Sequence, residues 1–491
     1  MSLETLYNEV SNPLDNKDFL DTVINAYLST TRYKGFYGRL VKYNANKKKY
    51  PNYYNNKDKD ELYSLLFNEW KHRIVNMTKQ EYDYLCRKGY LNEKFPVLRN
   101  YLKTVPNVNT YEEVNNILHS SYNDRALDSA MDMYRFTAFG EGSSWNHISS
   151  NKITTEKDPI FRIYHRLYLN TEGIDTYKVV AEFTKKCLER NIPYYYKFTE
   201  YADREDNIVV YSDTEHLYDY IEILREIKKE QAHIKPLDPP FMSASIDGWI
   251  GYGSDPERKA NGELQSFNEK RADMLQRNIK ETAFIWMDRN SNVTVKKKGK
   301  SKYIKDYFSD KCAQFLLQDL KERYERLMDH YSEEELINML GYSLNDLSNP
   351  LVKKNISHEL SLRMNDIRNI DNINIEMEVR DGKTIHFTNY HLEEAIKRLI
   401  EVIRPGRGEE FKYILKNEII ETSPQNNISM HNFAFDTSAI RRINKEIVRQ
   451  RKSSTTYSLT RDEIIQDKVN RQLDEMFRTP TEEDLVDTKK I

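Results

Sequence analysis

FRIYHRLYLN, residues 161–170, is the stretch of sequence from which the architecture of the chain can be predicted. Apolar Ile163, Leu167 and Leu169 alternate with larger polar or aromatic side chains. A period of two is typical of a β-strand, because successive side chains point to opposite faces of a sheet. We therefore expect a half-buried strand here. One face would present Arg162, Tyr164, Arg166, Tyr168 and Asn170, and His165 would be the polar member of the apolar face.

The residues that follow indicate a small sheet with helices. Residues 174–190 have the spacing of a helix, and the strand-like runs YYYKF and NIVVYS end at residues 198 and 212. An amphipathic helix is expected to begin at His216. The predicted order is strand, helix, strand, strand, helix.

The flanking regions are predicted to be mainly helical. Residues 1–130 contain four helical patterns joined by polar connectors, and residues 139–152, rich in Gly and Ser, are expected to form a loop. After residue 290 a lysine-rich turn, KKKGKSK, precedes further helices, a β-hairpin around Asp381-Gly382 and a last helix capped at Thr460. The prediction is an α+β protein with a helical N-terminal region (1–130), a core with a central mixed sheet and flanking helices (131–290), and a mainly helical C-terminal extension with one β-hairpin (291–491).

Composition excludes several classes of protein. The chain has 491 residues, with 75 basic and 77 acidic residues, so no global field would recruit nucleic acid or a membrane. Its three cysteines are widely spaced, which argues against a disulfide framework or a structural zinc. The start of the chain lacks the pattern of a Sec signal, and no apolar run is long enough to span a bilayer. We expect a cytoplasmic protein, and an injected effector remains open.

Candidate chemistry gathers in the predicted sheet. Lys197 interrupts an aromatic strand, and burial or neighbouring cations would lower its pKa toward that of a general base. Its alternative role is that of an edge-strand lysine that guards against aggregation. Arg204 and Tyr211 flank the next strand, and Arg204 could instead pair with neighbouring acids. His165 could equally be a hydrogen-bonded core histidine.

A glycine-rich segment, GWIGYGSDP at residues 248–256, is expected to form a turn with exposed backbone. SFNEKR then begins a helix, whose free N–H groups could bind an anion, although Ser266 could simply cap it. The segment has neither GK[ST] nor GxGxxG, and the chain has neither HExxH nor GxSxG. P-loop, dinucleotide-binding, zinc-peptidase and α/β-hydrolase sites are therefore not indicated.

The order R-x-Y-x-x-L-Y-L-N, P-Y-Y-Y-K, R-x-D-N-I-V-V-Y, P-P-F-M, G-W-I-G-Y-G-S-D-P and S-F-N-E-K-R resembles the HopA-type family over about residues 160–272. That bacterial family includes a plant-pathogen type III effector and lyase-like components of peptide-modification (RiPP biosynthesis) systems, such as class V lanthipeptide and thioviridamide-type pathways. The family pattern has S-F-G where this chain has Ser266-Phe267-Asn268. The resemblance implies an α+β core that handles phosphorylated peptides.

The resemblance also implies a reaction, elimination of phosphate from phosphoserine or phosphothreonine, with no metal and no cofactor. Carried over by position, Lys197 would be the base and Tyr211 or His165 the acid. The phosphate clamp would be Arg162 and Arg204, with Asn170, Arg271 and Ser266 as further substrate-binding groups. The partner would be a peptide or protein that carries phosphate, and no nucleic acid or membrane is expected.

Two other functions remain open from the sequence. The same fold could serve a non-catalytic effector or interaction protein that binds a phosphorylated or acidic partner, because a fold does not guarantee an activity. An ADP-ribosyltransferase-like toxin is a weaker alternative, since the chain shows no catalytic ExE in a suitable loop.

Overall fold

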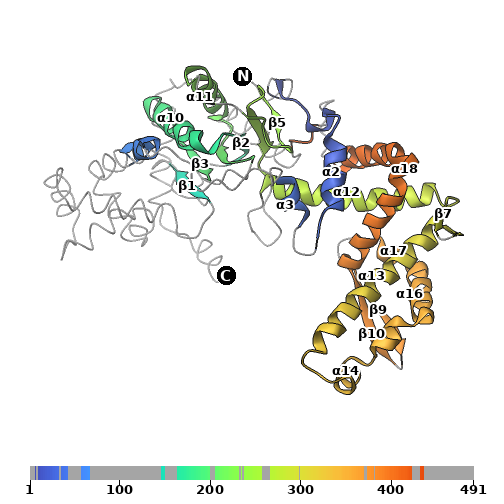
Figure 1. Ribbon diagram of the computed structural model, residues 1–491. Helices are drawn as coiled ribbons and strands as arrows, with labels where there is room; N and C mark the ends of the chain where they lie inside the picture. Colours follow the sequence, from blue (N-terminus) through green and yellow to red (C-terminus); the bar gives the residue numbers. More distant parts are fainter. Residues whose placement is uncertain are drawn as a thin grey trace, which may run out of the picture. The chain divides into compact units, whose positions relative to one another are not determined.

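A computed structural model describes two compact units of the chain (Figure 1). The first comprises residues 1–11, 42–264 and 434–491, and the second comprises residues 12–41 and 265–433. The residues described are 6, 9–31, 35–41, 57–62, 64–66, 145–149, 163–199, 205–231, 234, 237–256, 266–297, 299–369, 373–380, 382–422 and 432–435.

The first unit is built on a six-stranded sheet with the strand order β1-β3-β4-β2-β6-β5. Every ladder of this sheet is antiparallel, where the sequence analysis expected a mixed sheet. Its strands are β1 (Asn146–Ser149), β2 (His165–Leu169), β3 (Tyr195–Phe198), β4 (Ile208–Ser212), β5 (Ala244–Ser245) and β6 (Ile250–Ser254). The α+β class and the order strand, helix, strand, strand, helix from β2 onward are confirmed.

Two helices cover one face of this sheet. They are α10 (Thr176–Glu189), which follows the short 3-10 helix η2 (Gly173–Asp175), and α11 (Leu217–Glu230). Phe183 of α10 packs edge-on against Tyr196 of β3 and Tyr220 of α11, with ring centroids 5.8 Å and 5.5 Å apart. Thr184 and Tyr196 share a buried hydrogen bond of 2.7 Å. These aromatic contacts form the core between sheet and helices.

Strand β2 lies in the interior of the sheet, between β4 and β6, and all five of its residues are buried. The prediction of a half-buried strand is therefore wrong. The alternation of the sequence is nevertheless correct in register, because Arg166 lies opposite Tyr211 and His165 lies opposite Ser212. The two faces of β2 differ in chemistry, and both are removed from water.

Two segments expected to be irregular contain strands. Part of the predicted loop forms β1, which pairs with β3, and the predicted glycine-rich turn forms β6. Gly251 and Gly253 lie opposite Tyr168 and Arg166 of β2. A Cβ at Gly251 would lie 2.5 Å from Oγ of Ser243, so this glycine allows the segment just before β5 to pack closely against β6 and does not mark a turn.

The second unit consists of helices and two β-hairpins. A 3-10 helix, η1 (Pro13–Asp15), precedes its first helix. The helices are α2 (Phe19–Leu28), α3 (Phe36–Val41), α12 (Phe267–Arg289), α13 (Ile304–Leu327), α14 (Glu333–Leu340), α15 (Leu344–Ser348), α16 (Pro350–Leu362), α17 (Met364–Ile367) and α18 (Asn389–Thr422). Helix α18 is kinked, with non-helical backbone angles from Pro405 to Arg407.

The predicted hairpin around Gly382 is confirmed as β9 (Asn374–Arg380) and β10 (Lys383–Thr388). A second hairpin, β7 (Thr294–Lys297) and β8 (Lys300–Tyr303), stands where a lysine-rich turn was predicted.

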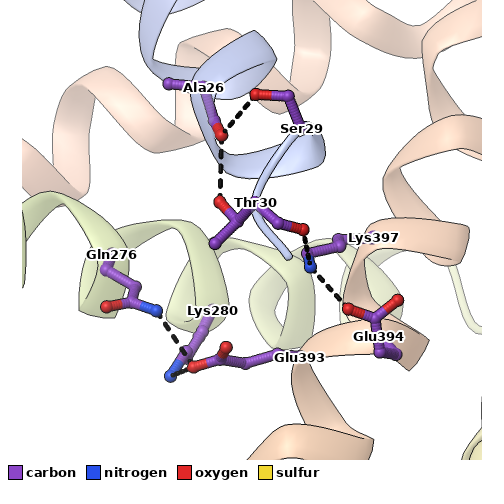
Figure 2. A network of polar contacts seen from close by, with 8 residues as sticks. All are labelled: Ala26, Ser29, Thr30, Gln276, Lys280, Glu393, Glu394 and Lys397. Atoms are coloured by element: carbon purple, nitrogen blue, oxygen red, sulfur yellow. Dashed lines mark hydrogen bonds and ion pairs between the residues drawn. The ribbon is translucent and has the colours of Figure 1, made fainter. Parts of the chain in front are cut away.

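A polar network joins helices α2, α12 and α18 of the second unit (Figure 2). Nζ of Lys397 donates to the carbonyl oxygen of Thr30 at 2.8 Å and to Glu394 at 2.5 Å. Nζ of Lys280 donates to Glu393 at 2.7 Å. Because both lysines are buried, these partners are needed to offset the cost of removing an ammonium group from water.

The predicted three-part division of the chain stays a prediction. Within the predicted N-terminal region, helices α2 and α3 are described, and the helical patterns after residue 66 lie outside the described residues, as does the helix predicted after Thr460. None of the described helices combines the length and the apolar character needed to cross a lipid bilayer.

Candidate functional site

Cationic and phenolic side chains occupy the sheet face opposite to the one covered by α10 and α11, which we call the cationic face. Its members are Arg166, Tyr168, Tyr195, Lys197 and Tyr211. Strand register sets this grouping, because Arg166 pairs with Tyr211 across β2 and β4, while Lys197 pairs with Val209 across β3 and β4. Paired residues of antiparallel strands share a face, so Lys197 and Arg166 flank Tyr211.

Lys197 lies among aromatic rings. Its Nζ is 4.4 Å from the ring centroid of Trp145 and 5.9 Å from that of Tyr211. The ring of Tyr195 stacks on Tyr211 with centroids 4.6 Å apart. Lys197 is half-buried, and β3 has β1 and β4 on its two sides. An edge-strand lysine that blocks aggregation is therefore not the role of Lys197.

Arg166 is held by a buried carboxylate on the other side of Tyr211. Its Nε and Nη2 lie 2.6 Å and 2.5 Å from Oδ1 of Asp255, and its Cζ lies 5.2 Å from the ring centroid of Tyr211. Burial lowers the pKa of Arg166, but the charge of Asp255 outweighs it, and the pKa lies above its usual value. The guanidinium is a permanent positive charge next to a phenol.

The cationic face combines groups that a phosphate elimination requires. It contains an amine that could take a proton, a phenol that could donate one, and a fixed cation beside the phenol. Neighbouring Tyr168 is buried, and burial raises its pKa well above the usual value, so this second phenol stays protonated. The same charges could also hold an anion without any reaction.

His165 faces the opposite way, with the apolar residues of β2. Its Nδ1 is 2.8 Å from the hydroxyl of Tyr252, and its Nε2 is 3.3 Å from Oγ1 of Thr214. Its side chain is fully buried, and burial lowers its pKa to about 3 against the opposing charge of Asp213. This geometry is that of a hydrogen-bonded core histidine, neutral at physiological pH.

The shifted pKa of His165 predicts a pH dependence of stability. Its pKa falls from 6.5 to about 3 on folding, so the unfolded chain binds the proton more tightly. The contribution of His165 to the free energy of unfolding is fully present above pH 6.5. It decreases by about 1.4 kcal/mol per pH unit as the pH falls from 6.5 toward 3. We expect His165→Asn to flatten the dependence of the unfolding free energy on pH between 6.5 and 4.5, measured by urea titration.

The exposed His358 on α16 supplies the control for that experiment. His358→Asn should leave the slope of stability against pH unchanged. A slope that is equally steep in His165→Asn and in the unmodified chain would contradict the assignment of a neutral buried histidine.

Asn170 forms hydrogen bonds with two segments of the first unit that follow α11. Nδ2 of Asn170 donates to the backbone carbonyl of Asp238 at 2.9 Å, and the backbone carbonyl of Asn170 accepts from Nε1 of Trp249 at 3.3 Å. Asn170 is buried. Its bond to Asp238 secures the chain between α11 and β5, and the bond from Trp249 secures the chain just before β6.

Two of the predicted substrate-binding residues belong to the second unit. Ser266 is the N-cap of α12, and its side chain accepts from the backbone N–H of Glu269 at 3.0 Å. Arg271 is buried, with its Cζ 5.4 Å and 5.1 Å from the rings of Phe267 and Phe433. In that unit Ser266 caps a helix and Arg271 packs on aromatic rings.

The two predicted clamp residues, Arg162 and Arg204, lie outside the described residues. Among the candidates the structure thus brings together Lys197 and Tyr211. It also includes Arg166, which the sequence analysis placed on the same strand face as Arg162 without giving it a role. It adds Asp255 and Trp145, which the sequence analysis did not select. Those two residues carried no comparable signal in the sequence.

Comparison with known proteins gives a family match for the segment that contains Arg166, Lys197, Tyr211 and Asp255. Residues 147–314 match the HopA1 effector protein family, which confirms the resemblance predicted from the sequence. A solved structure of an effector protein from Pseudomonas syringae pv. tomato strain DC3000 is similar, with 11% identity over 53% of this chain and 88% of that chain and a TM-score of 0.29. A comparison with curated protein sequences gave no match.

Proposed function

The chain contains a HopA1 effector family region at residues 147–314, and we propose that this region eliminates phosphate from phosphothreonine or phosphoserine in a peptide or protein. The observation that carries the proposal is the flanking of Tyr211 by two cationic side chains. Nζ of Lys197 and Cζ of Arg166 lie 5.9 Å and 5.2 Å from the Tyr211 ring centroid. A base, an acid and a permanent cation are thereby available on one sheet face.

In the proposed reaction, Nζ of Lys197 takes the proton from Cα of the phosphorylated residue. The electron pair forms the Cα–Cβ double bond, and the Cβ–O bond breaks. Phosphate leaves and takes the proton of the Tyr211 hydroxyl, which is then restored by the proton held on Lys197. The products are a dehydroamino acid residue and inorganic phosphate.

Arg166 would act on this reaction through its charge. Negative charge develops on the carbonyl oxygen next to Cα as the proton leaves, and a fixed cation in a site removed from water stabilises such charge. Because Asp255 already orients the guanidinium, its position costs little reorganisation during the reaction. By resemblance to the family, Arg162 and Arg204 would hold the phosphate dianion with bidentate hydrogen bonds.

The test is incubation of the full chain with a tryptic phosphopeptide library, followed by mass spectrometry. We expect some peptides to lose the elements of phosphoric acid and then to add a thiol such as β-mercaptoethanol across the new double bond. Hydrolysis to unmodified threonine or serine adds no thiol. Hydrolysis alone, or an unchanged library, would refute the proposed elimination.

A second candidate function is binding of a phosphorylated or acidic partner without reaction. The contacts of Lys197 with Trp145 and Tyr211 favour it, because cation–π contacts stabilise an ammonium group in its charged form. A charged Lys197 can hold an anion but cannot take a proton. Retention of phosphopeptides on the immobilised chain, with no change in their mass, would support this function.

A further inference from the structure

The hairpin of β7 and β8 is a strongly charged feature of the second unit that the proposed function does not use. Residues 290–305 contain six charged residues, and all six are lysines. No arginine and no acidic residue occurs among them, whereas the whole chain has a net charge of only −2. Positive charge is therefore concentrated in this hairpin, whereas basic and acidic residues nearly cancel over the whole chain.

The hairpin contributes little to the core. All four residues of β8 are exposed, and Gly299 has a positive φ of 76° at the turn. No residue of these two strands whose burial the structure describes is buried. A two-stranded hairpin of this kind is marginally stable, so packing does not explain its composition. In Figure 1, β7 stands at the end of α12, where the chain reverses toward α13.

The lysines at the base and those nearer the turn differ in their partners. Lys302 lies 3.6 Å from Asp310, and Lys305 lies 2.9 Å from Asp288. By contrast, Lys296 and Lys300 are exposed and make no ion pair with any residue that the structure describes. Positive charge near the turn is available to an external anion, while acidic residues offset it at the base.

An exposed aromatic residue accompanies this charge. Tyr303 at the end of β8 is 57% exposed, and strand register puts it on the same face of the hairpin as Lys296. Tyrosine has an apolar ring and a polar hydroxyl, a combination that favours the boundary between lipid headgroups and acyl chains.

From these observations we infer that the β7–β8 hairpin docks the protein on an anionic lipid bilayer. Clusters of four to eight basic residues are attracted to the negative surface of a membrane, and lysine suits this diffuse attraction as a point charge. Nucleic-acid recognition favours arginine, whose planar fork matches phosphate, over lysine, and this segment has no arginine. Here acidic residues confine the charge to the region near the turn. The inference departs from the sequence-based expectation that no membrane is a partner.

The experiment is sedimentation of the full chain with vesicles of phosphatidylcholine alone or with about one-third phosphatidylserine. Binding is expected only with phosphatidylserine, and it should weaken as salt is added. The variant Lys296→Gln/Lys300→Gln is expected to lower the vesicle partition coefficient roughly 30-fold, from the attraction of two lysines near a negative surface.

The matched control is Lys354→Gln/Lys416→Gln, which removes two exposed lysines from α16 and α18 of the same unit. It should bind vesicles like the unmodified chain. Equal losses in the two variants, equal binding to both kinds of vesicle, or hairpin-dependent binding to duplex DNA or polyglutamate without vesicle binding would each overturn the inference. Thermal unfolding of both variants checks that they fold. Because phosphopeptide elimination uses other residues, its outcome is independent of this test.

Discussion

Replacing Lys197 with methionine is expected to reduce phosphate elimination by about 10²–10⁴-fold, the usual contribution of a general base. Methionine keeps much of the length and apolar contact of the lysine stem, so Trp145 and Tyr211 keep a packing partner. The rate of dehydroamino acid formation should therefore fall much more than the stability of the protein. Mass spectrometry of a reactive phosphopeptide over time measures the rate.

Two further variants separate catalysis from binding. Lys197→Arg keeps a positive charge that does not deprotonate, so it should retain phosphopeptide binding while elimination is lost. Lys185→Met removes an exposed lysine of α10 and should leave the rate unchanged. Substantial elimination by Lys197→Arg would exclude Lys197 as the base. Loss of binding and elimination together in Lys197→Met, with both restored in Lys197→Arg, would assign Lys197 to anion binding instead.

Replacing Asp255 with alanine is expected to lower the free energy of unfolding by about 3–5 kcal/mol. The side chains of Arg166 and Asp255 are only 9% and 12% exposed, and two guanidinium nitrogens lie within 2.6 Å of one carboxylate oxygen. Without Asp255 the buried guanidinium keeps its charge and loses its counter-ion. Urea unfolding followed by tryptophan fluorescence measures the change.

An exposed pair provides the comparison for this variant. Arg398 and Glu401 lie 2.7 Å apart with side chains 49% and 48% exposed, so Glu401→Ala should cost less than about 1 kcal/mol. The double variant Arg166→Met/Asp255→Leu removes both charges and should recover much of the stability lost in Asp255→Ala. If Asp255→Ala lowers the free energy of unfolding no more than Glu401→Ala does, Arg166 does not depend on Asp255 as a buried counter-ion.

Local pattern was sufficient to predict the central elements, because β2, α10, β3, β4 and α11 follow one another closely in the sequence. It could not predict the burial of β2. Arg166 reads as a solvent-facing residue in a period-two pattern, yet its counter-ion Asp255 comes 89 residues later. Likewise, the glycines of β6 resemble a turn until Tyr168 and Arg166 are known to lie opposite them.

The residues of the candidate site also fall into those that local sequence pattern can predict and those that it cannot. Lys197 and Tyr211 come from consecutive antiparallel strands, so their common face follows from the sequence once the pairing of β3 and β4 is assumed. Trp145 reaches Lys197 only through the long-range pairing of β1 with β3. No local pattern indicates such a contact, because register between distant strands depends on the whole sheet.

The discontinuous course of the first unit has a consequence for folding during synthesis. The backbone N–H of Ser254 in β6 donates to the carbonyl of Ala434 at 3.0 Å, and residues 265–433, which lie between them, belong to the other unit. A ribosome must therefore produce a complete second unit before this contact can form. Contacts of such long sequence separation slow folding, so the contact between β6 and Ala434 is expected to form late, after β6 has had time to pair with β2 and β5.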